Sequence, residues 1–219
     1  MEINTPLTVS EIDFRIQSVN NRKYATVLAY KDARVDMNRL DAVYGVDGWQ
    51  KEYREINGRL YCRVGIYSKK LLQWVWKEDV GTESNTEKEK GQASDAFKRA
   101  CFNLGIGREL YDYPLIQFQF NDSEVEQHNG KWRPKWGVNI NRWKWLTIFH
   151  NERLVKLSVK DDKNKVRFLW DDYDYLVEVN QSSIDAIKEG IVNNDLSTSG
   201  EAWRELGEEM QTALWKAPT

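Results

Sequence analysis

Lys98 and Arg99 form an adjacent pair of cations in a segment with the spacing of an amphipathic helix. Apolar residues recur there at three- and four-residue steps and define one core-facing stripe, made up of Ala93, Ala96, Phe97, Ala100, Cys101 and Leu104. The two cations fall beside the stripe, where a polyanion can reach them. An ordinary alternative is a surface ion pair between Asp95 and Arg99, four residues apart on the same helix. Residue types alone leave both interpretations open.

Signatures of enzyme chemistry are weak in this sequence. No Gly-x-x-x-x-Gly-Lys-Ser/Thr loop announces ATP binding, and His128 and His150 stand apart from any cysteine or carboxylate at metal-ligand spacing. The remaining candidates for metal ligands of a nuclease are two acidic groups, Asp171 with Asp172 and Asp174, and Glu87 with Glu89. Acidic turns and helix starts are more often solvated or capping. We therefore expect a protein that is not an enzyme and uses no cofactor or metal.

The charge of the chain is almost balanced, with 32 Lys and Arg against 34 Asp and Glu in 219 residues. A net charge of −2 argues against a general polyanion binder, so a nucleic-acid site must be a local basic surface. Two cysteines without paired spacing favour neither a disulfide scaffold nor a zinc site. No apolar leader and no membrane-length apolar run is present, which predicts a cytoplasmic protein without membrane contact.

The order of expected elements in the first half is a β-hairpin, a short helix, three strands and the long helix. Asp36 is the expected cap of the short helix, and a capping box from Thr86 to Glu89 opens the long one. Asn57-Gly58 is a strong hairpin signal. The expected strands are 12–16, 24–30, 49–56, 59–67 and 71–79. This order predicts an α+β fold in which a helix crosses an antiparallel β-β-β sheet.

A change of composition divides the rest of the chain. We expect a core at 1–120, a basic, tryptophan-rich β-unit at 121–179 and an acidic helical tail at 180–219. Alternation predicts β-unit strands at 143–149, 154–159 and 166–170. Cations interleaved with aromatic rings suit a single-stranded nucleic acid, and Trp143 and Lys144 are the candidate contacts. Equally, the tryptophans can form the core of this unit while the lysines keep it soluble.

The acidic tail carries two expected helices, opened by Ser182-Ser183 and by Ser199. The second is amphipathic, and such a helix most often packs onto its own protein. Because the tail and the β-unit have opposite charge, we also consider that the tail covers the basic unit until DNA displaces it. Deletion of 176–219 should then tighten DNA binding at low salt.

Two sequence blocks carry a family resemblance. One runs from Lys90 to Ala100, KGQASDAFKRA, and is followed by Leu-Gly and Leu-Tyr-Asp; the other is VDMNRLDAVYGVDGW, from Val35 to Trp49. In this order they resemble the Rad-fifty-two family of DNA single-strand annealing proteins, most of all its small phage branch, the Sak-type recombinases. The resemblance covers about half of the chain, from Ile12 to Tyr113.

The resemblance implies a homo-oligomeric ring or helical filament with single-stranded DNA in a basic groove. Lys98 and Arg99 match the basic pair of the groove helix. Tyr30 matches an aromatic contact in the hairpin, and Arg15 is our choice for the arginine of the preceding strand. A further family arginine aligns with Phe102, a departure that removes one phosphate contact.

Two further sets of contacts follow from this resemblance. Arg108 is the candidate substitute for the missing arginine. Lys88 and Lys90 are the remaining candidates for a second, outer DNA site, because the stretch before the helix is short here. The implied function is ATP-independent annealing of complementary strands in recombination and double-strand break repair, in a bacterial host cytoplasm if the chain is phage-encoded. A host single-strand-binding protein or recombinase is a further candidate partner.

Two other functions stay open from the residues themselves. A passive single-strand-binding module would protect DNA without speeding the pairing of strands. A metal-dependent nuclease, the less favoured alternative, would cut DNA when magnesium is added.

Overall fold

The computed structural model describes residues 2–82, 88–193, 195–206 and 211. Its helices are α1 (Ala33–Tyr44), α2 (Lys88–Phe102), α3 (Tyr173–Val179), α4 (Gln181–Val192) and α5 (Leu196–Glu205). Its strands are β1 (Asp13–Val19), β2 (Tyr24–Tyr30), β3 (Trp49–Ile56), β4 (Arg59–Ser68), β5 (Gln73–Val80), β6 (Ile116–Gln119), β7 (Val125–His128), β8 (Lys131–Pro134), β9 (Lys144–His150), β10 (Arg153–Lys160) and β11 (Val166–Asp171). The expected α+β class is confirmed.

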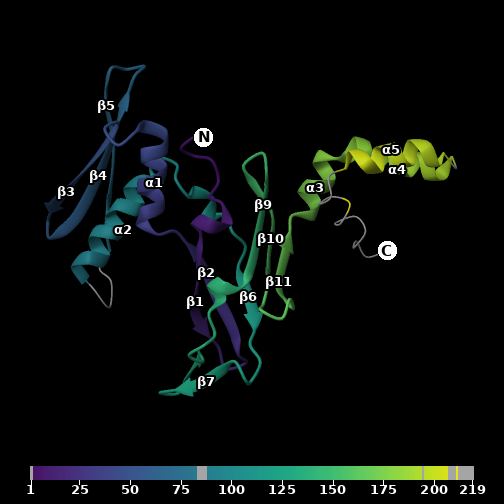
Figure 1. Ribbon diagram of the computed structural model, residues 1–219, viewed down its shortest axis with the longest axis horizontal. Helices are drawn as coiled ribbons and strands as arrows, with labels where there is room; N and C mark the ends of the chain where they lie inside the picture. The colour runs from purple at the N-terminus through teal and green to yellow at the C-terminus, as the bar shows by residue number, and fades with distance from the viewer. Residues whose placement is uncertain (1, 83–87, 194, 207–210, 212–219) are drawn as a thin grey trace.

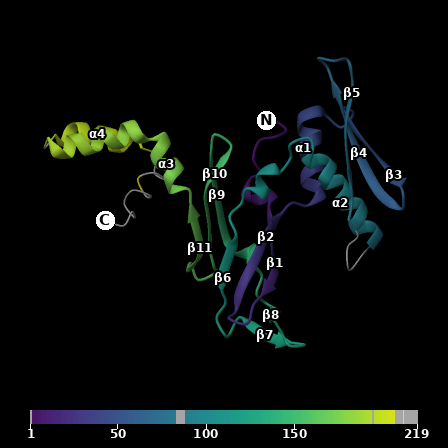
Figure 2. The same ribbon diagram turned by 180° about the vertical axis from the view of Figure 1, so that it is seen from behind.

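Three parts lie in a row along the molecule (Figure 1). At one end β3, β4 and β5 form an antiparallel sheet with α1 and α2 beside it. The middle holds two sheets, with strand orders β1-β2-β6 and β11-β10-β9. At the other end α4 and α5 pack together and extend away from the sheets, as the view from behind also shows (Figure 2).

The β-β-β-α unit has the predicted arrangement. β4 pairs with β3 on one side and with β5 on the other, and α2 packs on β4 and β5. Asn57 and Gly58 have φ values of 53° and 72°, the left-handed pair that a two-residue hairpin of this kind requires. Cys62 and Val64 of β4 point to the same face of the sheet and join the apolar stripe of α2 in the core.

The two middle sheets share one hydrophobic core. The ring of Phe14 in β1 stacks on Trp145 in β9, with 3.6 Å between ring centroids. Phe118 in β6 lies 5.2 Å from the ring of Trp143. One cluster of buried side chains continues from Leu7 into β10. The hydrophobic core therefore includes residues on both sides of residue 120. The division of the chain into segments 1–120 and 121–179 stays a prediction.

The start of α1 differs from the expectation. Asp32, not Asp36, is the N-cap, and its Oδ1 accepts a hydrogen bond of 2.8 Å from the backbone N–H of Arg34. The prediction for Asp36 was wrong because this residue lies one turn inside the helix, fully buried, and forms an ion pair with Lys31. The sequence contains two aspartates of the type that caps helices, Asp32 and Asp36. Asp36 is paired with the buried Lys31, and Asp32 caps the helix.

The second sequence block ends in a Gly-x-x-Gly-Trp turn, Gly45 to Trp49, whose glycines have a steric explanation. Gly45 ends α1 with φ of 80°. A Cβ on Gly48 would lie 2.0 Å from the carbonyl oxygen of Tyr44, so a side chain does not fit there. The indole N–H of Trp49 donates to Asp41 Oδ1 at 2.7 Å and ties the start of β3 back to α1. The motif thus fixes the connection between helix and sheet.

We expect Gly48→Ala to lower the free energy of unfolding by about 2–3 kcal/mol, because the new methyl group must displace backbone. Urea denaturation followed by circular dichroism measures this. Gly200→Ala is the matched control, since nothing lies within 4 Å of a Cβ at that position in α5. An equal loss in both variants would contradict the steric explanation.

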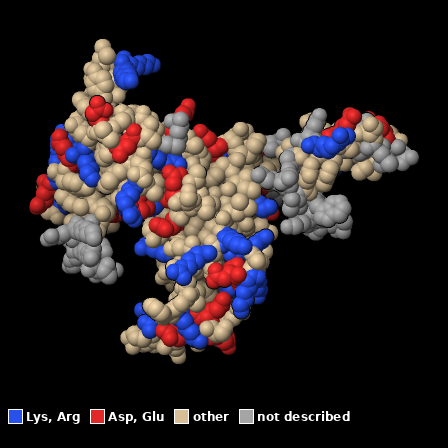
Figure 3. Space-filling model, viewed as in Figure 1, with Lys and Arg blue, Asp and Glu red and all other residues tan. Residues whose placement is uncertain are grey.

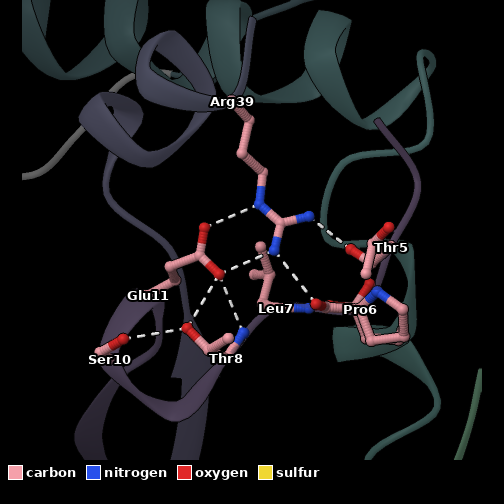
Figure 4. A network of polar contacts seen from close by, with 8 residues as sticks. Thr5, Pro6, Leu7, Thr8, Ser10, Glu11 and Arg39 are labelled. Carbon is pink, nitrogen blue, oxygen red and sulfur yellow. Dashed lines mark hydrogen bonds and ion pairs between the residues drawn. The ribbon is translucent and has the colours of Figure 1, made fainter. Parts of the chain in front are cut away.

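Arg39 of α1 holds the N-terminal segment in place (Figure 4). Its Nε and one terminal nitrogen donate to the two oxygens of Glu11, both at 2.7 Å. The guanidinium also donates to the carbonyls of Thr5 and Pro6. Glu11 in turn accepts from the backbone N–H of Thr8 at 2.9 Å. This buried arginine therefore sets where β1 begins relative to α1.

The C-terminal helices attach to the β-unit through a small second cluster. Val155 of β10 packs with Leu176 and Leu206, and Trp203 lies against them. The three β-unit strands and a tail packed on its own protein agree with the expectation. α4 and α5 extend away from the sheet and do not lie over it (Figures 1 and 2). The hypothesis that the tail covers the basic unit until DNA displaces it therefore stays a prediction. The capping box at Thr86 lies outside the described residues. The expected helix openings at Ser182-Ser183 and Ser199 were wrong, because α4 already begins at Gln181 and α5 at Leu196, so these serines lie inside the helices.

No helix among the described residues is long and apolar enough to cross a membrane. Basic and acidic side chains are interspersed on the face shown in Figure 3. On this face, therefore, positive and negative side chains lie next to one another.

Candidate nucleic-acid interface

A cleft of about 460 Å³ lies between the β1–β2 hairpin and the outer face of α2. Four residues expected to contact DNA line it, Arg15, Tyr30, Lys98 and Arg99. They come from three elements that are 15 to about 80 residues apart in the chain. The turn Arg108–Tyr111 closes one end of the cleft through Tyr111. The fold thus brings together side chains that the sequence keeps apart.

Arg15 and Tyr30 are diagonal neighbours across the hairpin. Asp13 pairs with Tyr30 and Arg15 with Leu28, so Arg15 and Tyr30 share one face of the sheet. The guanidinium carbon of Arg15 lies 5.5 Å from the centroid of the Tyr30 ring. Burial raises the pKa of the Tyr30 hydroxyl, which therefore stays neutral at physiological pH. A cation resting on an aromatic ring is preorganised for a phosphate next to a base.

Lys98 and Arg99 project from α2 into the same cleft. Arg99 forms an ion pair of 3.2 Å with Asp79 of β5, and its side chain stays partly exposed. Asp95 accepts from the backbone and the hydroxyl of Thr82, at 2.9 and 2.8 Å. The expected alternative, a surface pair of Asp95 with Arg99, is therefore not formed. Exposed pairs such as Arg99–Asp79 contribute little, so a phosphate can replace Asp79 at small cost.

A buried ion pair lies at the back of the cleft. Lys31 lines the cleft with its stem and forms an ion pair with Asp36, and both side chains are almost completely buried. Burial raises the pKa of Asp36 to about 6, against the opposing attraction of Lys31 and Lys98. A Cβ on Gly107 would lie 2.8 Å from the Lys31 side chain, so glycine is what lets this stem pass.

Three cleft residues were missed by reasoning from the sequence. Tyr111 is 75% exposed at the rim and packs edge-on against Phe102, with 4.8 Å between ring centroids. The second missed residue is Phe102, which stands at the position where the resemblance led us to expect an arginine. The third is Lys31. The available signal for Tyr111 was the pair Gly105 and Gly107, because glycines with positive φ turn the chain sharply at the end of a helix, and here they bring Tyr111 back to α2.

Arg108 has a different placement from the other four. Its guanidinium donates to the carbonyls of Phe102 and Asn103, each at 2.9 Å, at the C-terminal end of α2. It therefore caps the helix and is not among the residues that line the cleft. A phosphate contact by Arg108 stays a prediction.

The profile of the Rad52/22 family of double-strand break repair proteins matches residues 1–132, which is more than half of the chain. The chain belongs to the Rad52/22 family. The matched region contains every residue of the cleft and both sequence blocks that carried the resemblance.

Two curated relatives are similar to part of the chain. The single-stranded DNA-binding protein DdrA of Deinococcus deserti is 36% identical over 119 residues, which cover 53% of this chain and 57% of the relative. The protein of the same name from Deinococcus radiodurans is 31% identical over 138 residues, which cover 61% and 64%. The chain therefore matches about three fifths of the length of these relatives.

Four further candidate contacts remain to be placed. Lys88 and Lys90 begin α2, and their side chains are outside the described part. Lys144 is exposed in β9 and donates to Asn164 Oδ1 at 2.7 Å. Trp143 is 6% exposed and packs against Phe118, so its ring could not stack on a base without leaving the core.

In the β-unit, some of the tryptophans and one of the cations, Arg167, pack inside the protein. Arg167 lies 4.9 Å from the centroid of the Trp143 ring and forms ion pairs with Glu124 at 2.8 Å and Asp161 at 3.1 Å. A core role of tryptophans in this unit, one of the two alternatives, therefore holds for Trp143 and for the stacked Trp145.

The acidic residues considered as metal ligands of a nuclease are Asp171, Asp172 and Asp174, with Glu87 and Glu89 as a second group. Asp172 forms an ion pair of 2.7 Å with Arg153, and the side chains of Glu87 and Glu89 lie outside the described part. Among the residues that the structure describes, no group of three or more His, Cys, Asp or Glu side chains is placed to hold a metal ion.

Proposed function

We propose that this chain binds single-stranded DNA in the cleft between the β1–β2 hairpin and α2, and that it anneals complementary strands without ATP. In this role Lys98, Arg99 and Arg15 neutralise phosphates, and Tyr30 supports the sugar or base next to Arg15. The observation that carries the proposal is the convergence of these residues on one open cleft. Membership of the Rad52/22 family supports it, and so does the similarity to the two DdrA relatives, which are single-stranded DNA-binding proteins.

Annealing requires no bond to be broken by the protein. Its barrier is kinetic, since two flexible strands that repel each other must be extended and aligned. Side chains that contact the phosphate backbone lower this repulsion and leave base edges free to pair. Three cations that reach solvent line the cleft, Arg15, Lys98 and Arg99, against one carboxylate, Asp95, which gives a locally positive surface in a chain of net charge −2. Lys31 adds little to this surface because it is paired with the buried Asp36.

We also propose the finer assignments that the resemblance implies. The protein would act as a homo-oligomeric ring or helical filament, in which clefts of neighbouring subunits align along one strand. It would belong to the phage Sak-type branch and meet a host single-strand-binding protein or recombinase. It would not be an enzyme. Light scattering with and without DNA tests the assembly.

The test of function is the pairing of two complementary dye-labelled oligonucleotides at low salt, without ATP and with EDTA. We expect pairing much faster than the spontaneous rate, because the protein screens the charge of both strands. Tight binding with pairing at the spontaneous rate would identify a passive binding module instead. Shortening of the oligonucleotides on addition of magnesium would identify a nuclease.

A further inference from the structure

Trp136 is the most exposed large apolar residue among those described, with 99% of its surface open to solvent. It lies in the loop between β8 and β9, beside Lys135, and the same loop carries Arg142. Both cations are exposed, and neither forms an ion pair with a described residue. An aromatic ring of this size in water is unusual in a protein with other tryptophans packed in its core.

The loop is held in a defined position. The side-chain oxygen of Asn141 accepts a hydrogen bond of 2.7 Å from the backbone N–H of Phe14 in β1. The side chain of Asn139 accepts from the N–H of Asn141 at 3.0 Å, and Ile140 is buried in the core. Trp136 is therefore presented from a loop that is anchored on both the first strand and the core.

A second cleft, of about 510 Å³, opens beside this ring. Its lining includes the apolar residues Phe14, Ile16 and Ile140, of which Phe14 and Ile140 are buried. Lys135, Trp136 and Arg142 also line it, and no Asp or Glu does. Phe14 and Ile16 alternate along β1 with Arg15, which lines the cleft at α2. Since neighbouring residues of a strand point to opposite faces, the two clefts use opposite faces of β1.

We infer that the loop at 135–142 is a second contact for single-stranded nucleic acid, in which a base stacks on Trp136 while Lys135 and Arg142 bind the adjacent phosphates. Stacking on an open ring combined with unpaired cations is the chemistry that sequence-tolerant single-strand sites share. The inference rests on the proposed function, yet this site lies outside the cleft at α2. Its lining also extends beyond residue 132, where the family match ends.

A nucleic acid fits this site better than a second copy of the chain. The lining offers two cations without an acidic partner, and on the face shown in Figure 3 acidic side chains are interspersed with basic ones. A polyanion provides closely spaced negative charge and flat rings together.

The test compares full-length wild type with Trp136→Ala, Trp136→Phe and the double variant Lys135→Gln/Arg142→Gln, using a dye-labelled oligothymidylate at several salt concentrations. We expect about tenfold weaker binding for Trp136→Ala and partial retention for Trp136→Phe, because phenylalanine keeps a ring on which a base can stack. The double variant should reduce the slope of log K against log salt by about 0.7 for each phosphate that it no longer binds. Leu72→Ala and Lys69→Gln/Lys70→Gln, at exposed positions outside both clefts, should bind as wild type does.

The outcomes separate this inference from the proposed function. Wild type that binds tightly, together with unchanged binding by Trp136→Ala, would overturn the second contact and leave the cleft at α2 standing. A change of oligomeric state in Trp136→Ala without loss of DNA affinity would overturn it in favour of a contact between copies. If the wild type does not bind single-stranded DNA at all, the proposed function is contradicted, and the second contact falls with it. Ultraviolet crosslinking of an iodouracil oligonucleotide to residues 131–142 would support the inference.

Discussion

The double variant Lys98→Ala/Arg99→Ala is expected to bind single-stranded DNA at least about 100-fold more weakly than wild type, because each of the two hydrogen bonds to a charged group contributes about 1.5–3 kcal/mol. The loss should be similar for all base sequences, since phosphate contacts carry little sequence information. The slope of log K against log salt should fall by about 1.4, or about 0.7 for each contact. Fluorescence anisotropy with labelled oligonucleotides of different sequence measures both effects.

The control for this experiment is Lys69→Ala/Lys70→Ala, which removes two adjacent cations from the exposed turn between β4 and β5. If the site is the cleft, this change of net charge has little effect. Equal losses in both double variants would mean that binding follows overall charge. Loss of the exposed Arg99–Asp79 pair costs at most about 1 kcal/mol, so the variant should fold. A folded variant with wild-type affinity would refute the site.

The second large effect is expected on stability, from Arg39→Met. This change removes the hydrogen bonds to Glu11, Thr5 and Pro6 and leaves a carboxylate without its cation. Breaking such a buried pair costs about 3 kcal/mol, which urea denaturation at pH 7 would detect. Arg34→Met is the matched control, because Arg34 lies on the same helix with its side chain in solvent. We expect a change of less than about 0.5 kcal/mol there.

The same ion pair predicts a dependence on pH. Hydrogen bonds from Arg39 lower the pKa of Glu11 from 4.5 to about 2. Because the pKa in the folded state lies below the unfolded value, the stabilisation is complete above pH 4.5 and is lost as the pH falls from about 4.5 to 2. In Arg39→Met this part of the acid dependence should disappear. Parallel acid profiles of variant and wild type would contradict the assignment.

The sequence by itself determined the local elements of the family region. Asn57-Gly58 specified its hairpin, because only residues that tolerate left-handed conformations allow so tight a turn. The three- and four-residue spacing of apolar residues specified which face of α2 enters the core, and so left Lys98 and Arg99 outside it. The resemblance then selected Arg15 and Tyr30, which no local pattern marks.

Tertiary structure decided what each polar or aromatic side chain does. Trp143 and Trp136 both stand among cations in the sequence, yet one is buried beside Phe118 and the other lies in solvent. Arg99 forms an ion pair with Asp79 in β5 and not with Asp95, which lies four residues earlier on the same helix. Asp95 instead accepts a hydrogen bond from Thr82. Such choices depend on contacts between residues far apart in the chain, and the pattern of neighbours along the sequence does not contain them.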